Sequence, residues 1–338
     1  MATTNTIGTT GRDYSTLQAW EDALPATTTS GYIGECYNDS QFTAGVTIDG
    51  HTTGAADFIT LRAATGQSFS DNASVQTNAL RYNQSNGVGI TIADGYATTI
   101  TAVDNYVTVD KLQVRNTGTA HSGGGVIYFN NVTNGLVSNC ITEGPCGNNS
   151  IIRMESTDAS SLIKQCLVIL NDPNPTSGRG SVYLFTGAQI YNSTIVAPSD
   201  LSPTGALAVQ NSYGTGIVTN CAIFGFNTLS SGTFTFTTCA TDLASPPAGV
   251  TGSLTYANQF QNTAEATADF RLKTGADCLD TGTTDTTNGT PDIAGTARPS
   301  GSAYDIGCWE LVAAGGAAVG FGPLLGGQRN RHVLNGRA

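Results

Sequence analysis

The sequence predicts an all-β solenoid, a right-handed parallel β-helix, from an internal repeat, the composition of that repeat and a change of phase inside it. A six-residue phrase begins every 26 to 28 residues in the middle of the chain. Its copies span residues 137–142, 163–168, 190–195 and 218–223, with weaker copies at 109–114 and 236–241. A repeat of this length is typical of a solenoid, in which each unit buries its apolar face only against its neighbours.

The repeat is composed of strands. Val, Ile, Thr, Tyr and Phe dominate it, and Gly, Asn and Pro separate the apolar runs, as expected for short strands and turns. A further strand precedes each phrase, at residues 126–129, 151–154, 182–185 and 206–209. Early, less regular strands are expected at residues 32–33, 46–48, 58–61 and 90–92. Three short strands per repeat predict roughly eight stacked rungs between residues 30 and 241.

A corner is expected inside each phrase. The inward-facing residues of each phrase are the one three positions before the Cys, the Cys itself and the residue two after it. A straight strand would instead point every second residue inward. A bend at the preceding amide residue restores the pattern, and Asn tolerates the left-handed backbone conformation that such a bend requires. The corner residues assigned in this way are Asn139, Asn192 and Asn220.

The cysteines of the phrase form one column, with Cys140, Cys166, Cys221 and Cys239 joined by Ser193. We interpret them as reduced core thiols, because buried Cys behaves as a small hydrophobic residue. The alternatives are a metal site or a set of disulfides, but the spacing has no C-x-x-C element. Pairing of Cys278 with Cys308 is left open.

Residues 1–29 are expected to contain one short amphipathic helix at 13–24. Ser15 is its candidate N-cap, and Pro25 follows it. Leu17, Trp20 and Leu24 fall on one face. A β-helix has an open apolar end, so the helix and Trp20 are predicted to plug it.

Residues 242–310 are expected to form a closing module. Four motifs follow one another there: Asp269-Phe-Arg-Leu272, Cys278-Leu-Asp280-Thr-Gly282, Asp292-Ile-Ala-Gly295-Thr-Ala-Arg298-Pro299 and Asp305-Ile-Gly-Cys-Trp-Glu310. Their order resembles the C-terminal module of right-handed parallel β-helix repeat proteins with a pectin-lyase-like fold. The resemblance implies the fold and says little about activity. Arg298 is interpreted as a structural cation that pairs with Asp292, Asp305 or Glu310 and fixes the last turns over the end of the coil.

Residues 311–338 are expected to form an extended tail, either without fixed structure or docked on a partner. Its apolar anchors would be Phe321, Leu324, Leu325, Val333 and Leu334. Its basic group would be Arg329, Arg331, His332 and Arg337, which an acidic surface would attract.

The composition disfavours several classes of protein. Only 12% of the 338 residues are charged and the net charge is −11, which argues against a nucleic-acid binder. No apolar run approaches the roughly 20 residues that cross a bilayer, so no membrane partner is expected. The N-terminus has neither a basic region nor an apolar segment, so no secretory signal is expected. Eight cysteines without a framework spacing suit a reducing site of synthesis.

No catalytic, cofactor-binding or metal-binding residue is predicted. Glycoside hydrolysis would need two carboxylates that flank the sugar bond, and a lyase would need a base near bound calcium. The local candidates are Asp49 and His51 in an early rung, Asp104, Asp110 and Asp172. Each is more simply a turn residue, since Asp-Gly and Asp-Pro form turns.

The function expected from these features is a non-enzymatic structural part of a virion exterior, made in a host cytoplasm. It would be a bacteriophage capsid decoration protein, spike or short tail-spike component, docked through its tail to other virion proteins. Resemblance to phage spikes implies a homotrimer, with a host surface glycan as a further candidate partner. The alternatives are a spike that degrades polysaccharide, as a lyase or glycosidase, and a carbohydrate-binding adhesin.

Overall fold

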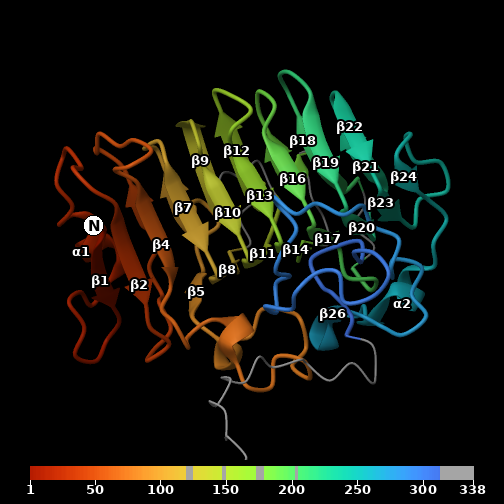
Figure 1. The fold of residues 1–338 in the computed structure, drawn as a ribbon, viewed down its shortest axis with the longest axis horizontal. Coiled ribbons are helices and arrows are strands. Elements are labelled where there is room, and N and C mark those ends of the chain that lie inside the picture. The colour runs from red at the N-terminus through yellow and green to blue at the C-terminus, as the bar shows by residue number, and fades with distance from the viewer. Residues whose placement is uncertain (119–124, 147–149, 173–178, 202–204, 313–338) are drawn as a thin grey trace, which may run out of the picture.

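The structure, a computed structural model, describes residues 1–118, 125–146, 150–172, 179–201 and 205–312. Its body is a right-handed parallel β-helix of about eight turns, which confirms the fold class predicted from the sequence. The coil runs from β1 and α1 at one end to β22 and β24 at the other (Figure 1). Parallel pairing of each strand with its counterparts in the neighbouring turns builds three sheets within the described residues.

The first sheet contains β1 (Thr3–Ile7), β2 (Tyr32–Cys36), β4 (Ile59–Ala63), β7 (Val107–Asp110), β10 (Leu136–Ser138), β13 (Leu162–Lys164), β16 (Gln189–Tyr191), β19 (Gly216–Thr219) and β22 (Phe234–Thr237). The second contains β5 (Gly89–Ile92), β8 (Gln113–Asn116), β11 (Ile141–Gly144), β14 (Leu167–Leu170), β17 (Thr194–Val196), β20 (Ala222–Phe224), β23 (Cys239–Thr241) and β24 (Val250–Thr251). The third contains β3 (Val46–Ile48), β6 (Ile100–Ala102), β9 (Ile127–Val132), β12 (Ile152–Ser156), β15 (Gly180–Leu184), β18 (Leu207–Asn211) and β21 (Thr228–Ser231). Their positions follow the strands expected from the repeat.

The chain turns from the first sheet into the second at one column of residues. Asn139, Gln165, Asn192 and Asn220 have φ angles of 53°, 47°, 48° and 53° there. Lys111 and Thr238 occupy the same place in the weaker copies of the phrase, with φ angles of 59° and 51°. We call these six residues the corner column. The turn lets Val137 and Cys140 both point inward although three positions separate them.

The interior of the coil is apolar and includes the thiol column. Cys140, Cys166, Cys221 and Cys239 are fully buried free thiols, and Ser193 is fully buried between them. Burial raises the pKa of the Cys140 and Cys221 thiols well above the usual value. These thiols therefore stay protonated and act as small core residues.

The N-terminal helix is shorter than expected. The helix α1 spans Leu17–Glu21, and Thr16 rather than Ser15 caps it, because the Thr16 hydroxyl accepts the Ala19 N–H at 3.0 Å. Residues 13–15 cannot be helical, since the Tyr14 N–H donates to the Thr6 carbonyl of β1 at 3.1 Å. The strand β1 itself was not anticipated. Trp20 is fully buried in the main core.

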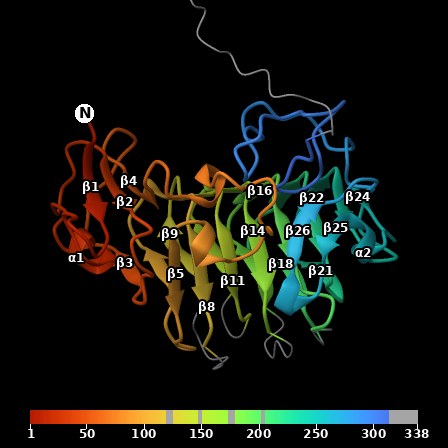
Figure 2. The ribbon, with the colours of Figure 1, turned by 90° about the horizontal axis from the view of Figure 1, so that it is seen from below.

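Only residues 242–253 of the closing module cover the end of the coil. The rest of the module, residues 254–310, packs on the side of the coil, so the expectation that its last turns lie over the end is wrong (Figures 1 and 2). It contains α2 (Tyr256–Gln259), β25 (Phe260–Asn262), the 3-10 turn η3 (Glu265–Thr267) and β26 (Asp269–Leu272). Two further 3-10 turns lie in the segment before β5, η1 (Phe69–Asp71) and η2 (Gln84–Asn86).

The reason for this position is the outer face of the second sheet, which is apolar. Its outward residues include Ile141, Leu167, Ile169, Val196, Ala222 and Phe224. They form a second core with Phe260, Phe270 and Trp309 of the module and Leu80 of the earlier segment. The last turn of the coil is covered by residues 242–253 at the start of the module, from which Leu243 and Val250 pack on the main core.

Candidate functional site

A column of aromatic and charged side chains lies on the outer face of the third sheet. Tyr128 of β9, Arg153 of β12 and Tyr183 of β15 occupy matching positions in adjacent strands. The Arg153 guanidinium carbon is 4.9 Å from the centre of the Tyr128 ring and 5.3 Å from that of Tyr183. Arg179 contacts the Tyr183 ring as well, at 5.3 Å. A cation between two rings is held by their quadrupoles, so this part of the face is preorganised.

Glu155 connects the column to its neighbours. Its carboxylate accepts a hydrogen bond from the Tyr128 hydroxyl at 2.7 Å and another from Arg153 Nε at 3.0 Å. Burial and the nearby Glu155 carboxylate raise the pKa of Tyr128 to about 12. The phenol therefore stays a hydrogen-bond donor at neutral pH, and the Glu155 carboxylate stays fixed against Arg153.

The column ends in an exposed ring. Tyr183 lies 6.0 Å from Phe185, and Phe185 lies 4.5 Å from Tyr213, measured between ring centres. The Tyr183 hydroxyl donates to Ser212 Oγ at 2.6 Å, which fixes the turn that carries Tyr213. Tyr213 is 62% exposed.

We call Tyr128, Arg153, Glu155, Tyr183, Phe185 and Tyr213 the aromatic ladder. The sequence interpretation missed it. Its only signal was the position of Tyr128, Arg153 and Tyr183 at the same outward place of three predicted strands.

The structure brings three of the polar candidates from the sequence together at the N-terminal end. His51 Nε2 lies 2.9 Å from Glu21 Oε1, and its Nδ1 lies 3.0 Å from the Pro25 carbonyl. The backbone N–H of His51 donates to the Asp104 carboxylate at 3.2 Å, and that of Asp49 donates to Glu21 Oε1 at 3.1 Å. Burial lowers the pKa of His51, but the hydrogen bonds to Glu21 and to the Pro25 carbonyl, together with the nearby Asp104 charge, raise it overall. The cluster fastens α1 to the coil.

The other two candidates lie elsewhere. Asp110 of β7 accepts hydrogen bonds from Ser138 Oγ at 2.7 Å and Asn139 Nδ2 at 2.9 Å, on the outside of the first sheet. Asp172 is buried just beyond β14. Neither lies in the aromatic ladder.

The corner column also contacts the closing module. Asn220 Nδ2 donates to the Thr283 carbonyl at 2.5 Å, and the Thr283 N–H donates to Asn220 Oδ1 at 2.7 Å. Gln165 and Asn192 both donate to the Asn288 carbonyl.

Arg298 lies buried inside the closing module. Its Nε is 3.3 Å from Glu310 Oε2, and its Nη2 donates to the Gly307 carbonyl at 2.7 Å. Burial raises the pKa of Asp292 and of Asp305 to about 6, and Arg298 opposes the rise in both. The ion pair to Glu310 links the last two motifs of the module. Cys278 and Cys308 are buried free thiols.

The proposed docking residues of the tail, which are Phe321, Leu324, Leu325, Arg329, Arg331, His332, Val333, Leu334 and Arg337, lie outside the described residues. In the described part of the chain, no helix has the length and apolar character needed to span a membrane.

No protein-family model and no curated protein matches the chain. Among solved structures it is similar to a pectin methylesterase variant in complex with a hexasaccharide, at 13% identity and a TM-score of 0.46, covering 75% of this chain and 93% of that one. It is also similar to the pectin methylesterase of Aspergillus niger, at 16% identity and a TM-score of 0.43, covering 73% of this chain and 79% of that one. These similarities concern the path of the backbone, not the chemistry of any residue.

Proposed function

We propose that the protein is a rigid, non-enzymatic rod of an assembly exterior that binds polysaccharide along the aromatic ladder. The observation that carries this proposal is the exposed Tyr213 ring, which packs at a tilt of 52° against Phe185 at the end of a column fixed by Arg153. The C–H faces of sugar rings stack on exposed aromatic rings, and their hydroxyls bond to planar charged groups such as Arg and Glu.

The direction of the ladder suits a polymer. Its members follow one another over β9, β12, β15 and the turn after β18, so they run along the axis of the coil. Neighbouring strands lie about 4.8 Å apart, so the ladder extends over several such spacings. Tyr183 and Glu155 are buried, so the surface that a polysaccharide contacts along this line consists of the partly exposed Tyr128, Arg153 and Phe185 and the exposed Tyr213. An elongated surface of this kind fits consecutive sugar units of one chain.

Replacing Tyr213 by alanine is expected to weaken polysaccharide binding about two- to twelve-fold, since an aromatic contact contributes roughly 0.5–1.5 kcal/mol. Affinity electrophoresis of the full-length protein in gels that contain capsular or cell-wall polysaccharides measures this. Tyr96→Ala is the matched control, because Tyr96 is 71% exposed and lies outside the ladder. Absence of retardation by every polysaccharide, or equal loss in both variants, would contradict the proposal.

Cleavage of the polysaccharide is the competing function. The ladder supplies one carboxylate, Glu155, which Tyr128 and Arg153 already hold. A glycosidase uses two carboxylates on either side of the sugar bond. Release of reducing ends or unsaturated sugars by the wild-type protein, abolished in Glu155→Gln, would replace the binding function by an enzymatic one.

We infer from the sequence that the tail attaches the rod to a virion or a similar particle. Residues 1–310 carry all 25 acidic residues, whereas the tail carries three arginines and no acid. This asymmetry favours an acidic partner surface and a contact that weakens with salt. Analytical ultracentrifugation of the full chain tests the expected homotrimer.

Truncation of the tail is expected to leave the melting temperature close to that of the full chain and to abolish incorporation into particles. The cut belongs after Val312 rather than after Glu310, because the Leu311 N–H donates to the buried Asp305 carboxylate at 2.7 Å. Thermal unfolding and co-sedimentation with particles measure the two effects. A truncated protein that still assembles, or one that does not fold, would show that the tail is not the docking arm.

A further inference from the structure

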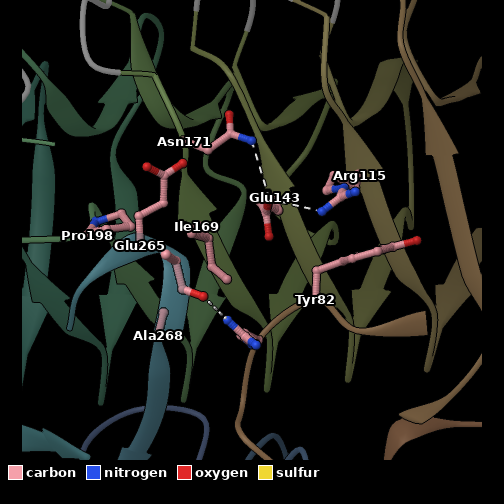
Figure 3. Close-up of a pocket in the computed structure, with 10 residues that line it drawn as sticks. Tyr82, Arg115, Glu143, Ile169, Asn171, Pro198, Glu265 and Ala268 are labelled. Carbon is pink, nitrogen blue, oxygen red and sulfur yellow. Dashed lines mark hydrogen bonds and ion pairs between the residues drawn. The ribbon is translucent and has the colours of Figure 1, made fainter. Parts of the chain in front are cut away.

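A separate cavity of about 440 Å³ lies on the outer face of the second sheet (Figure 3). Three parts of the chain form it: the second sheet, the segment before η2 and the closing module around η3. Its polar lining consists of Arg81, Tyr82, Arg115, Glu143, Asn171 and Glu265. The volume falls within the range of about 300–1,000 Å³ that small-molecule sites occupy.

Glu143 stands at the centre of the polar lining, with Arg115 and Asn171 directed toward it (Figure 3). Arg115 Nη1 lies 3.6 Å from Glu143 Oε1, and Asn171 Nδ2 donates to the same oxygen at 3.4 Å. Both distances are long for hydrogen bonds of charged groups, which are usually about 2.7–2.9 Å. Among the described residues, the buried Arg115 Nε has no hydrogen-bond partner. The long contacts therefore leave Glu143 Oε1, Arg115 Nη1 and Asn171 Nδ2 with hydrogen-bonding capacity toward the cavity, whereas the Arg115 Nε is closed off from solvent.

The Arg115 side chain is held beside the cavity and cannot easily turn away from it to find other hydrogen-bond acceptors. Its guanidinium carbon lies 4.5 Å from the centre of the Tyr82 ring. The Tyr82 hydroxyl is held in turn by Thr91 Oγ1 at 2.6 Å. On the other side of the cavity, Arg81 Nη1 donates to the Ala266 carbonyl at 2.7 Å, which joins the early segment to the closing module. The wall is thus preorganised.

We propose that this cavity binds one neutral sugar unit, as a monosaccharide or the end of an oligosaccharide. The two guanidinium groups and two carboxylates of the lining balance each other, so a charged ligand gains no net attraction. A sugar hydroxyl both donates and accepts hydrogen bonds, so one hydroxyl can donate to Glu143 while it accepts from Arg115. Ile169, Pro198 and Ala268 supply an apolar wall for the C–H face of the ring.

The site is independent of the aromatic ladder. It lies on the second sheet, and none of its lining residues belongs to the ladder on the third sheet. A bound sugar unit would touch the closing module and the early segment together, which makes the cavity a site for recognition of a small saccharide rather than of a long polymer.

The test is titration of the full-length protein with glucose, galactose, mannose, N-acetylglucosamine and their neutral disaccharides, followed by saturation-transfer NMR and calorimetry. At least one of these sugars should bind saturably, with a dissociation constant on the order of 1 mM. Glu143→Ala should weaken that binding at least ten-fold, and Arg115→Lys should weaken it while keeping the charge. Glu35→Ala is the matched control, because Glu35 forms the same kind of cross-strand pair with Arg62, at 2.7 Å, outside the cavity.

Several outcomes would overturn the proposal: no saturable binding of any neutral sugar, equal binding by Glu143→Ala, or preference for a charged sugar, such as glucuronic acid or glucosamine, over the neutral ones. Thermal unfolding of each variant separates loss of binding from loss of fold. Tyr213→Ala should leave sugar binding in the cavity unchanged, and Glu143→Ala should leave polysaccharide retardation unchanged. Failure of one site is therefore distinguishable from failure of the other.

Discussion

Replacing Asn220 by leucine is expected to lower the free energy of unfolding by about 3–5 kcal/mol. Asn220 is fully buried and has a φ angle of 53°, a conformation that strains a branched side chain by roughly 1–3 kcal/mol. Leucine would also leave the N–H and the carbonyl of Thr283 without their side-chain partner. Thr283 is exposed, so water can replace part of these bonds and each of the two contributes about 1 kcal/mol. The sequence alone predicts roughly 1–3 kcal/mol, from a strained corner and lost hydrogen bonds.

Two further variants separate these contributions in urea denaturation. Asn139→Leu has the same corner conformation, at a φ angle of 53°, but Asn139 is half-buried and its amide bonds to Asp110 at 2.9 Å. It should therefore lose only about 1–3 kcal/mol. Asn220→Gly avoids the backbone strain but still loses the two hydrogen bonds to Thr283. Equal losses in Asn220→Leu and Asn139→Leu would mean that the contacts with Thr283 contribute no stability.

The coil could be predicted from the sequence because its information is local. Each turn repeats the same alternation and the same corner, so one register explains residues as far apart as Asn139 and Asn220. The early strands lack the phrase, yet β3 and β5 lie where their β-branched runs predicted them. Stacking one rung on the next then follows from the repeat alone.

The position of the closing module could not be predicted in this way, because it depends on contacts between distant segments. The Cys308 N–H donates to Thr194 Oγ1 at 3.0 Å, and the Phe270 N–H donates to the Leu80 carbonyl at 3.1 Å. One signal was present. Residues 167–170 read Leu-Val-Ile-Leu without polar alternation, which is typical of a strand buried on both faces. That run indicated that something covers the second sheet, but not what covers it.

The same reasoning explains why the aromatic ladder and the sugar cavity were missed. Both consist of outward-facing residues, and the repeat constrains inward-facing ones. Tyr128 and Tyr183 come together only once the register of β9, β12 and β15 is known. Glu265 reaches the cavity only because the closing module folds back along the coil. The Asp and His residues singled out in turns were conspicuous in the sequence, but Asp49, His51 and Asp104 join α1 to the coil and Asp110 holds the neighbouring turn of the coil.

Replacing Arg298 by methionine is expected to destabilise the folded protein by about 3–5 kcal/mol at pH 8, the usual effect of breaking a buried ion pair. The Arg298 side chain is 0% exposed and that of Glu310 is 1% exposed. Removal of the guanidinium leaves the Glu310 carboxylate buried without its counter-charge and the Gly307 carbonyl without its donor. Methionine retains much of the apolar stem, so lost packing contributes little.

The loss should shrink as the pH falls. Burial raises the pKa of Asp292 to about 6 and raises that of Glu310, and Arg298 opposes both shifts. Without the guanidinium, both pKa values in the folded state rise further. At pH values between the ordinary pKa of a carboxyl group, near 4, and the raised pKa in the folded variant, the folded variant binds more protons than the unfolded chain. Its free energy of unfolding therefore increases as the pH falls through that window. The deficit relative to the wild type should therefore be smaller at pH 5 than at pH 8.

Urea denaturation of the wild type and of Arg298→Met at pH 5 and pH 8 measures this dependence. Arg62→Met is the matched control, because the Arg62 side chain is 38% exposed and its pair with Glu35 faces solvent on the first sheet. An exposed pair of this kind contributes less than about 1 kcal/mol, so the control should lose little at either pH. If Arg298→Met loses no more stability than Arg62→Met, or loses the same stability at both pH values, then Arg298 does not compensate the charge of the buried acids of the closing module. The alternative would be that those acids are protonated in the folded protein at pH 8, and that the hydrogen bonds to their backbone partners alone hold the module on the coil.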